Sequence, residues 1–342
     1  MKLVGFLLAL SCALAAAAAE ASVGLIEIPG QDGEGVVTIY YRSTDEAKLV
    51  KRSPFTFDYA WRGVPARGNG RLIVISHGSG GSPWVHANLA QTLVADGFVV
   101  AMPEHRGDSY QDHSTPGPES WKRRPLEVSR TIDVVSRDAR LSPLLMLDKV
   151  GLYGMSAGGH TALSLAGGRW SPARFTQHCE AHIADDFPAC VGLATGLRGT
   201  WLDGPKKTIA LWVIRYRFSD ATWQTHTDPR IAAIVASVPY AADFDMASLA
   251  APRVPLALVT ARHDKWLAPR FHGDAVLAAC ASCERLADFA TGGHGALLSP
   301  LPPGLTGLIG DLLNDPPGFD RAGELPPVDR KISAFFRKLL LP

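Results

Sequence analysis

The sequence has 342 residues, a length that fits either two domains or one large α/β domain with insertions. Hydrophobic residues make up 46% and charged residues 20%, which excludes a chain that is disordered throughout. Lys and Arg number 34 against 33 Asp and Glu, so no basic surplus indicates nucleic-acid binding and no acidic surplus indicates a solvating tail.

Residues 1–21 have the pattern of a secretory signal peptide. Lys2 precedes a long apolar run, and Ala-Glu-Ala at 19–21 is an A-x-A cleavage site. A membrane anchor, or a lipoprotein attached through Cys12, is the alternative. No later window has about 18 uninterrupted apolar residues, so we expect no stable membrane insertion of the mature chain. The expected mature protein therefore starts at residue 22 and is secreted or periplasmic.

The next segments predict a sheet that begins with antiparallel strands. Alternation and β-branched or aromatic residues at 36–42 and 55–61 predict two antiparallel edge strands. Apolar runs then predict strands buried on both faces, at 72–76, 98–102 and 149–153. Helical spacing predicts three helices, at 82–97, 125–141 and 157–165. The polar stretch 103–121 predicts a loop.

This alternation of strand and helix predicts a mostly parallel α/β sheet flanked by helices. Residues 169–229 interrupt the alternation and are too long for a crossover loop, so we expect a small cap insertion there. Strands and helices then resume at 231–238, 254–261, 270–280, 285–289 and 328–340.

Four cysteines follow the predicted signal peptide: Cys179, Cys190, Cys280 and Cys283. Export places them in an oxidising compartment, where the pairs closest in sequence form disulfides most easily, giving Cys179–Cys190 and Cys280–Cys283. A redox motif is the rival interpretation of the second pair, although no thioredoxin-like unit surrounds it. A zinc site from all four is disfavoured, because no histidine joins them at ligand spacing.

The central motif is Gly-Met-Ser-Ala-Gly at 154–158, between a predicted strand and a predicted helix. This is the context that a G-x-S-x-G nucleophile elbow requires. Its glycines permit a strained turn that exposes the Ser156 hydroxyl above the strand end. The amide of Ala157, at the start of the helix, is then one candidate oxyanion donor.

A serine nucleophile needs a base, and His294 is the candidate because it follows the last predicted strand. Asp264 follows the preceding strand and is the candidate acid that orients the histidine. The order Ser156, Asp264, His294 is the order found in enzymes that have a G-x-S-x-G nucleophile elbow. Asp243 and Asp245 are the rival acids.

The second oxyanion donor is expected in the glycine-rich loop 76–82. We expect the amide of Ser79 to serve, with Gly80 as the alternative. A phosphate-binding loop is disfavoured, because the segment lacks the Lys-Ser/Thr of a P-loop and the spacing of a dinucleotide fingerprint.

The polar loop 104–113 is expected either to line the substrate site or to be held at the surface by its own salt bridges. On the first interpretation Arg106 and Asp108 contact substrate, together with His77. A metal site is a further, less favoured alternative, formed from His105, Asp108, Asp112 and His113.

These motifs together resemble the α/β-hydrolase superfamily. Ser-His-Gly-Ser-Gly-Gly at 76–81, Pro-Glu-His-Arg-Gly-Asp at 103–108 and Gly-Met-Ser-Ala-Gly-Gly at 154–159 are similar to the bacterial dienelactone-hydrolase-like proteins, which are related to platelet-activating-factor acetylhydrolases. The resemblance covers about residues 35–300 apart from the insertion. Dienelactone hydrolases have a cysteine nucleophile where this chain has Ser156, so the resemblance implies a more general ester hydrolase.

The expected reaction is ester hydrolysis through an acyl-enzyme, with a small-molecule or lipid ester as substrate and with no cofactor or metal. A phospholipase or acetylhydrolase that acts at lipid surfaces is the main alternative, and it predicts an apolar face on the cap. A peptidase and a catalytically silent binding protein are the others. The sequence does not predict an oligomeric state.

Overall fold

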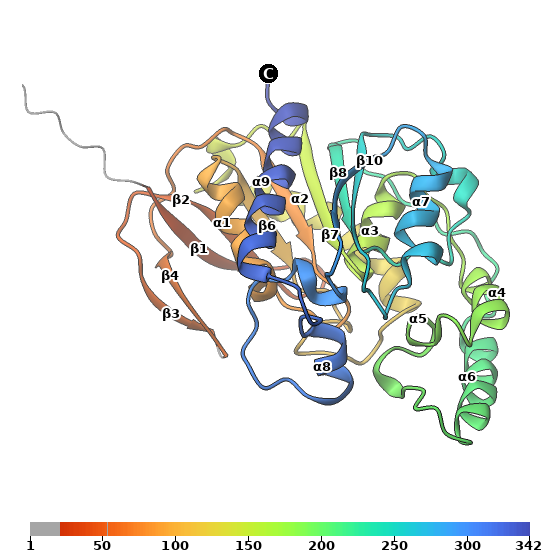
Figure 1. Ribbon diagram of the computed structural model, residues 1–342. Helices are drawn as coiled ribbons and strands as arrows, with labels where there is room; N and C mark the ends of the chain where they lie inside the picture. Colours follow the sequence, from red (N-terminus) through yellow and green to blue (C-terminus); the bar gives the residue numbers. More distant parts are fainter. Residues whose placement is uncertain (1–20, 53) are drawn as a thin grey trace, which may run out of the picture.

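The computed structural model describes residues 21–52 and 54–342 (Figure 1). The predicted signal peptide, apart from Ala21, therefore lies outside the described residues. Within them the chain forms one sheet from the following strands: β1 Ser22–Pro29, β2 Val36–Ser43, β3 Lys48–Arg52, β4 Phe55–Trp61, β5 Leu72–Ser76, β6 Val99–Pro103, β7 Val150–Met155, β8 Ile231–Ser237, β9 Leu256–Ala261 and β10 Glu284–Phe289. Their order across the sheet is β10-β9-β8-β7-β5-β6-β2-β1-β4-β3.

The strands from β6 to β10 in this order are parallel, and the N-terminal strands add a mixed extension. β2 pairs antiparallel with both β6 and β1, β4 runs parallel to β1, and β3 closes this end of the sheet antiparallel to β4. The prediction of β2 and β4 as edge strands is therefore wrong. The strands that cover their edges, β1 and β3, were not predicted, because β1 starts at the expected cleavage site and β3 carries three basic residues.

Two layers of helices cover the faces of the sheet. In β5, Leu72 and Val74 point into one apolar core while Ile73 and Ile75 point into the other. Helices α1 (Ala87–Ala95) and α9 (Arg321–Leu340) complete the core on one face. Helices α2 (Glu119–Arg137), α3 (Ala157–Leu165) and α7 (Gly273–Ala279) complete it on the other. No helix in the described part of the chain is long and apolar enough to cross a membrane.

Two predicted helices begin earlier than expected. Helix α2 starts at Glu119 instead of 125, and α9 starts at Arg321 instead of 328. Local rules place Pro125 in the first turn of a helix, where proline is most common, and they favour a start after the pair Pro326-Pro327, yet both helices run through their prolines. A short helix, α8 (Gly307–Leu313), was not predicted at all.

The insertion at 169–229 is helical. It contains α4 (Pro172–His182), α5 (Phe187–Val191) and α6 (Asp203–Arg217), which Figure 1 shows together at one side of the molecule. A small apolar cluster around Phe175 and Ile214 joins these helices to Tyr240 and Leu267 of the main domain. At the base of the insertion, the backbones of Trp170 and Gln224 exchange two hydrogen bonds, of 3.3 and 2.8 Å.

Both expected cysteine pairs are bonded in the structure. The disulfide between Cys179 and Cys190 joins α4 to α5, with the two Cα atoms 5.8 Å apart. The disulfide between Cys280 and Cys283 links two residues of the turn that follows α7, with the Cα atoms 5.4 Å apart. The first bond therefore lies inside the insertion and the second lies in the main domain.

Candidate active site

Ser156 occupies a strained turn between β7 and α3. Its backbone has φ 57° and ψ −117°, a conformation that non-glycine residues rarely adopt. The flanking glycines make the turn possible. A Cβ on Gly154 would overlap the carbonyl oxygen of Gly158, and a Cβ on Gly158 would overlap the carbonyl oxygen of Ser76. The turn leaves the Ser156 side chain partly exposed above the end of the sheet.

His294 and Asp264 lie beside this serine. His294 begins a short 3-10 helix (η6, His294–Leu297) after β10, and Asp264 follows β9. The Oγ of Ser156 lies 3.0 Å from Nε2 of His294, and Nδ1 of His294 lies 2.7 Å from Oδ2 of Asp264. The other carboxylate oxygen of Asp264 accepts hydrogen bonds from the amides of Trp266 and Leu267, each 2.8 Å long. The three side chains thus form a continuous chain in which the acid is held at both oxygens.

The two rival acids are engaged elsewhere. Oδ2 of Asp243 lies 3.1 Å from Nε2 of His160, and both side chains are fully buried. Asp245 pairs with Arg169 and caps a short 3-10 helix (η4, Met246–Leu249). Neither carboxylate is hydrogen-bonded to His294, so the geometry favours Asp264 over both.

The amides of Ala157 and Ser79 are the candidate oxyanion donors. The amide of Ala157 is the first of α3, and within the described residues it has no hydrogen-bond partner. The same holds for the amide of Ser79, in the loop after β5. The amide of Gly80, by contrast, donates to Oδ1 of Asp108 at 3.2 Å. A Cβ on Gly78 would lie 3.8 Å from Oγ of Ser156, so this loop runs directly past the candidate nucleophile.

A buried ion pair holds this loop from behind. Asp108 accepts hydrogen bonds from the hydroxyls of Ser79 and Ser120, and its Oδ2 lies 2.9 Å from Nη2 of Arg124. Arg124, which is fully buried, also donates to the carbonyl oxygen of His77 at 2.6 Å. The Arg124 guanidinium and the two hydroxyls hold the pKa of Asp108 below its usual range, although burial acts in the opposite direction.

The expectation that His77 and Asp108 contact substrate needs correction. Nδ1 of His77 lies 2.7 Å from the carbonyl oxygen of Gly78, and its Nε2 accepts from the amide of His105. Burial lowers the pKa of the His77 imidazole well below its ordinary value. Because both side chains are bonded to the protein and almost fully buried, they support the loop and do not face the substrate.

A second buried contact, between His105 and Glu127, lies near the ion pair of Asp108 and Arg124. Nδ1 of His105 lies 2.5 Å from Oε2 of Glu127, and Nε2 of His105 lies 2.7 Å from Oγ of Ser76. Burial raises the pKa of Glu127 to about 7 and lowers that of His105 well below its ordinary value. Burial therefore disfavours the charged form of both partners.

Sequence reasoning missed Arg124 and Glu127 as residues of this region. Both occupy positions on α2 in phase with the buried Val128, Ile132 and Val135. Charged residues on the apolar face of a helix were the signal that could have identified them. Because the predicted helix starts at Pro125, Arg124 lies outside it and its place on the buried face could not be recognised.

The structure supports neither a substrate contact of Arg106 nor the metal alternative. The Arg106 side chain is exposed, and its guanidinium lies beside Gly33 in the turn between β1 and β2, so it is not brought together with Ser156. The four residues of the metal alternative are separated among different partners: Asp112, for example, accepts from the amides of Gly107 and Ser114. Among the described residues, no group of three or more His, Cys, Asp or Glu side chains could hold a metal ion.

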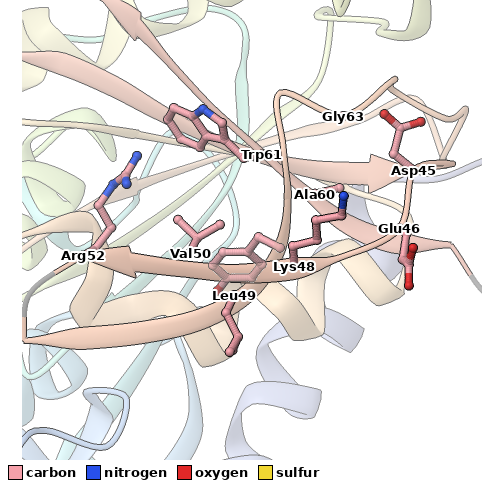
Figure 2. A pocket seen from close by; sticks show the side chains of 10 residues that line it. Asp45, Glu46, Lys48, Leu49, Val50, Arg52, Ala60, Trp61 and Gly63 are labelled. Carbon is pink, nitrogen blue, oxygen red and sulfur yellow. The ribbon is translucent and has the colours of Figure 1, made fainter.

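A groove of about 740 Å³ lies elsewhere, on β3 and β4 (Figure 2). Charged side chains such as Lys48, Arg52 and Asp45 line it together with Leu49 and Trp61. These strands lie at the opposite end of the sheet from β9 and β10, which carry Asp264 and His294. We therefore do not assign this groove to the candidate active site.

The mostly parallel sheet with helices on both faces, and with a strand–turn–helix elbow at Ser156, is consistent with an α/β-hydrolase fold, as predicted. Residues 63–119 match the family model described as platelet-activating factor acetylhydrolase, isoform II, which agrees with the resemblance seen in the sequence. This stretch includes the loop 76–82 and the segment 104–113, but ends before Ser156. A search of curated proteins found no match.

Proposed function

We propose that the protein is a serine hydrolase that cleaves carboxylic esters through an acyl-enzyme on Ser156. The main support is the unbroken chain of contacts from Ser156 through His294 to Asp264, at 3.0 and 2.7 Å. The family match over residues 63–119 supports the same class of reaction. Because a serine hydroxyl is a weak nucleophile, an adjacent oriented imidazole is the feature that this chemistry requires.

In the acylation step, Oγ of Ser156 attacks the ester carbonyl carbon while Nε2 of His294 takes the hydroxyl proton. The carbonyl oxygen becomes an oxyanion, which accepts hydrogen bonds from the amides of Ala157 and Ser79. The imidazolium of His294 then gives its proton to the leaving alkoxide oxygen, and the C–O bond of the ester breaks. Asp264 keeps the Nδ1 proton in place and stabilises the imidazolium.

Deacylation repeats these steps with water. His294 takes a proton from the water as its oxygen attacks the acyl carbon, and the same two amides hold the second oxyanion. The proton then passes from His294 to Oγ of Ser156 as the acyl–oxygen bond breaks. The products are a carboxylic acid and free enzyme, and the cycle needs no external reductant, oxidant or cofactor.

Replacement of the nucleophile tests this proposal. We expect Ser156→Ala to lower kcat on a chromogenic acetyl ester on the order of 10³-fold or more, and to abolish labelling by a fluorophosphonate probe. Ser136→Ala removes an exposed serine of α2 and serves as the matched control with unchanged activity and labelling. A wild-type protein that stays unlabelled would instead indicate a silent scaffold. An active Ser156→Ala variant would show that another nucleophile acts.

A lipid ester is the second, narrower candidate for the substrate. It is supported by the printed description of the matching family and by exposed apolar side chains on the insertion, among them Trp201 and Tyr216. A panel of acetyl, butyryl and octanoyl esters with a phospholipid would separate the two. Preference for the phospholipid over soluble esters supports the narrower function, and the reverse order supports a general esterase.

We also propose that the protein acts outside the cytoplasm. The two disulfides and the leader-like residues 1–21 support this location, since disulfides persist in oxidising compartments. N-terminal sequencing of the protein recovered after export tests it. A mature chain starting at residue 22 is the expected result, and an uncleaved chain retained in the cytoplasm would contradict it.

A further inference from the structure

One face of α6 exposes large apolar side chains. Ile209, Trp212, Val213 and Tyr216 follow the i, i+3, i+4, i+7 spacing of a single helical stripe, and their exposed fractions are 63%, 69%, 38% and 81%. The opposite side of the helix, with the buried Ile214, packs on the rest of the insertion. The stripe, which we call the α6 face, is therefore turned away from the protein's own core.

Further exposed apolar residues lie on the segment before α6 and on α8. Trp201, just before the helix, is 83% exposed, and Leu193 and Leu202 are about half exposed on the same segment of the insertion. Ile309 of α8 is also half exposed. Helix α8 packs against η6, which begins at His294, and a Cβ on Gly196 of the insertion would lie 3.2 Å from Leu308. The segment before α6 thus contacts α8, which in turn packs on the element that begins at His294.

The charges around the α6 face are mostly positive. Helix α6 contains four basic residues and one acidic residue. At 100° per residue, Lys206 and Arg217 lie on one flank of the stripe and Arg215 lies on the other. Lys206 pairs with Asp203 and Arg215 with Glu180. Within the described residues Arg217 has no carboxylate partner, so the rim keeps a net positive charge.

We propose that the α6 face docks on the surface of an anionic phospholipid bilayer. Trp and Tyr favour the boundary between water and acyl chains, and a basic rim is attracted to anionic head groups. A second copy of this chain is a poorer occupant, because a two-fold contact through this stripe brings the basic flanks of both helices together. The bilayer is therefore the partner that matches both the apolar stripe and its charge.

This inference deepens the proposed function and rests on it for one consequence. Docking through α6 brings the lipid surface next to the insertion, which contacts α8, and α8 packs against the short helix that begins at His294. The substrate class would then be ester lipids that reside in a membrane. Docking itself needs no catalysis, so it can be measured separately.

The test is co-sedimentation of the mature full-length protein with vesicles of ether-linked phospholipids, which contain no ester bond to cleave. Vesicles of ether-linked phosphatidylcholine with phosphatidylglycerol are compared with phosphatidylcholine alone, at low and high salt. We expect binding to the anionic vesicles that weakens at high salt. The double variant Trp212→Ser/Tyr216→Ser should bind at least roughly 10-fold more weakly, because two interfacial aromatic side chains are lost.

Two controls make the result specific. Leu49→Ser removes a side chain that is 76% exposed on β3, at the far end of the sheet, and should leave vesicle binding unchanged. The α6 double variant and Leu49→Ser should both keep wild-type kcat on a soluble acetyl ester, which shows that they fold. Ser156→Ala should bind the vesicles as the wild type does, which separates docking from catalysis.

Three outcomes overturn the inference. The first is no binding to anionic vesicles by a protein that hydrolyses soluble esters, which leaves the proposed function standing. The second is equal loss of binding in Leu49→Ser and in the α6 double variant. The third is a wild-type dimer in analytical ultracentrifugation that the double variant converts to monomer, which assigns the α6 face to a second copy of the chain.

Discussion

The carboxylate of Asp108 and the guanidinium of Arg124 form an ion pair that is almost entirely removed from solvent, with Oδ2 and Nη2 2.9 Å apart. The pair lies behind the loop that follows β5, and each partner also bonds to that loop. Asp108 accepts from the Ser79 hydroxyl and the Gly80 amide, while Arg124 donates to the His77 carbonyl oxygen. One charge pair therefore fixes the backbone that carries the second candidate oxyanion donor.

Weakening this ion pair should impair the chemical step more than substrate binding. We expect Asp108→Asn to lower kcat roughly 10- to 100-fold on a soluble ester with little change in KM, because a displaced Ser79 amide stabilises the oxyanion less well. Steady-state kinetics on the purified variant measure both parameters. Asp58→Asn, an exposed change of the same chemistry on β4, is the matched control. A rise in KM at unchanged kcat would instead assign Asp108 to substrate binding.

The acid of the candidate triad can be identified by two parallel substitutions. Asp264→Asn should lower kcat on the order of 10³- to 10⁴-fold, because the amide no longer fixes the Nδ1 proton of His294. Asp243→Asn should change kcat only a few-fold while lowering the melting temperature, because Asp243 is the buried partner of His160. The reverse order of effects on kcat would make Asp243 the catalytic acid.

The disulfide between Cys179 and Cys190 should stabilise the insertion. Its loop spans 11 residues, for which chain-entropy arguments give about 2–3 kcal/mol. We expect the Cys179→Ser/Cys190→Ser variant to lose protease resistance within 169–229 while it retains activity on a small acetyl ester. Limited proteolysis with mass spectrometry locates the cleavage sites. Cleavage spread evenly over the main domain would show that the bond stabilises the whole chain.

Asp329 gives stability a predictable dependence on pH. Burial raises its pKa from 3.8 to about 7, and the nearby Arg330 opposes this only partly. Below pH 3.8, the ordinary pKa of this group, the Asp329 carboxyl is protonated in both the folded and the unfolded chain. As pH rises toward 7, the unfolded chain releases the proton before the folded chain does, so the free energy of unfolding falls. The contribution of this group is therefore largest at acid pH and is lost above 7.

Replacement of the Asp329 carboxyl group should remove the loss of stability that occurs as the pH rises. We expect Asp329→Asn to raise the free energy of unfolding above pH 7 on the order of 1–4 kcal/mol and to flatten its decline between the two pKa values. Denaturant titrations across this pH range measure both effects. Asp311→Asn on α8, where the side chain is exposed, should leave the profile unchanged. A steeper decline in Asp329→Asn would contradict the assignment.

The features predictable from sequence were those encoded by short segments. The helix at 157–165 was predicted with its observed bounds, because the apolar run before it and the glycines at 154 and 158 specify a strand, a tight turn and a helix. His294 and Asp264 could be selected because each directly follows a strand of a parallel sheet. Chain order alone then suggested that they meet Ser156.

The features that escaped prediction depend on contacts between distant segments. Asp108 meets Arg124 only because α2 begins before Pro125, which local rules assign to the first turn of a helix. The strand β3 is polar and pairs only with β4, so its sequence has no buried pattern. The exposure of the α6 face likewise depends on which side of the helix meets α4 and α5, and periodicity does not specify that choice.

The paired backbones of Trp170 and Gln224 bring the two ends of the insertion side by side. The chain leaves the main domain and returns to it at neighbouring positions, and β7 and β8 pair directly without any strand from the excursion between them. The excursion therefore begins and ends at one place on the main domain. A change in the length of the excursion therefore leaves the pairing of β7 with β8, and with it the turn at Ser156, in place.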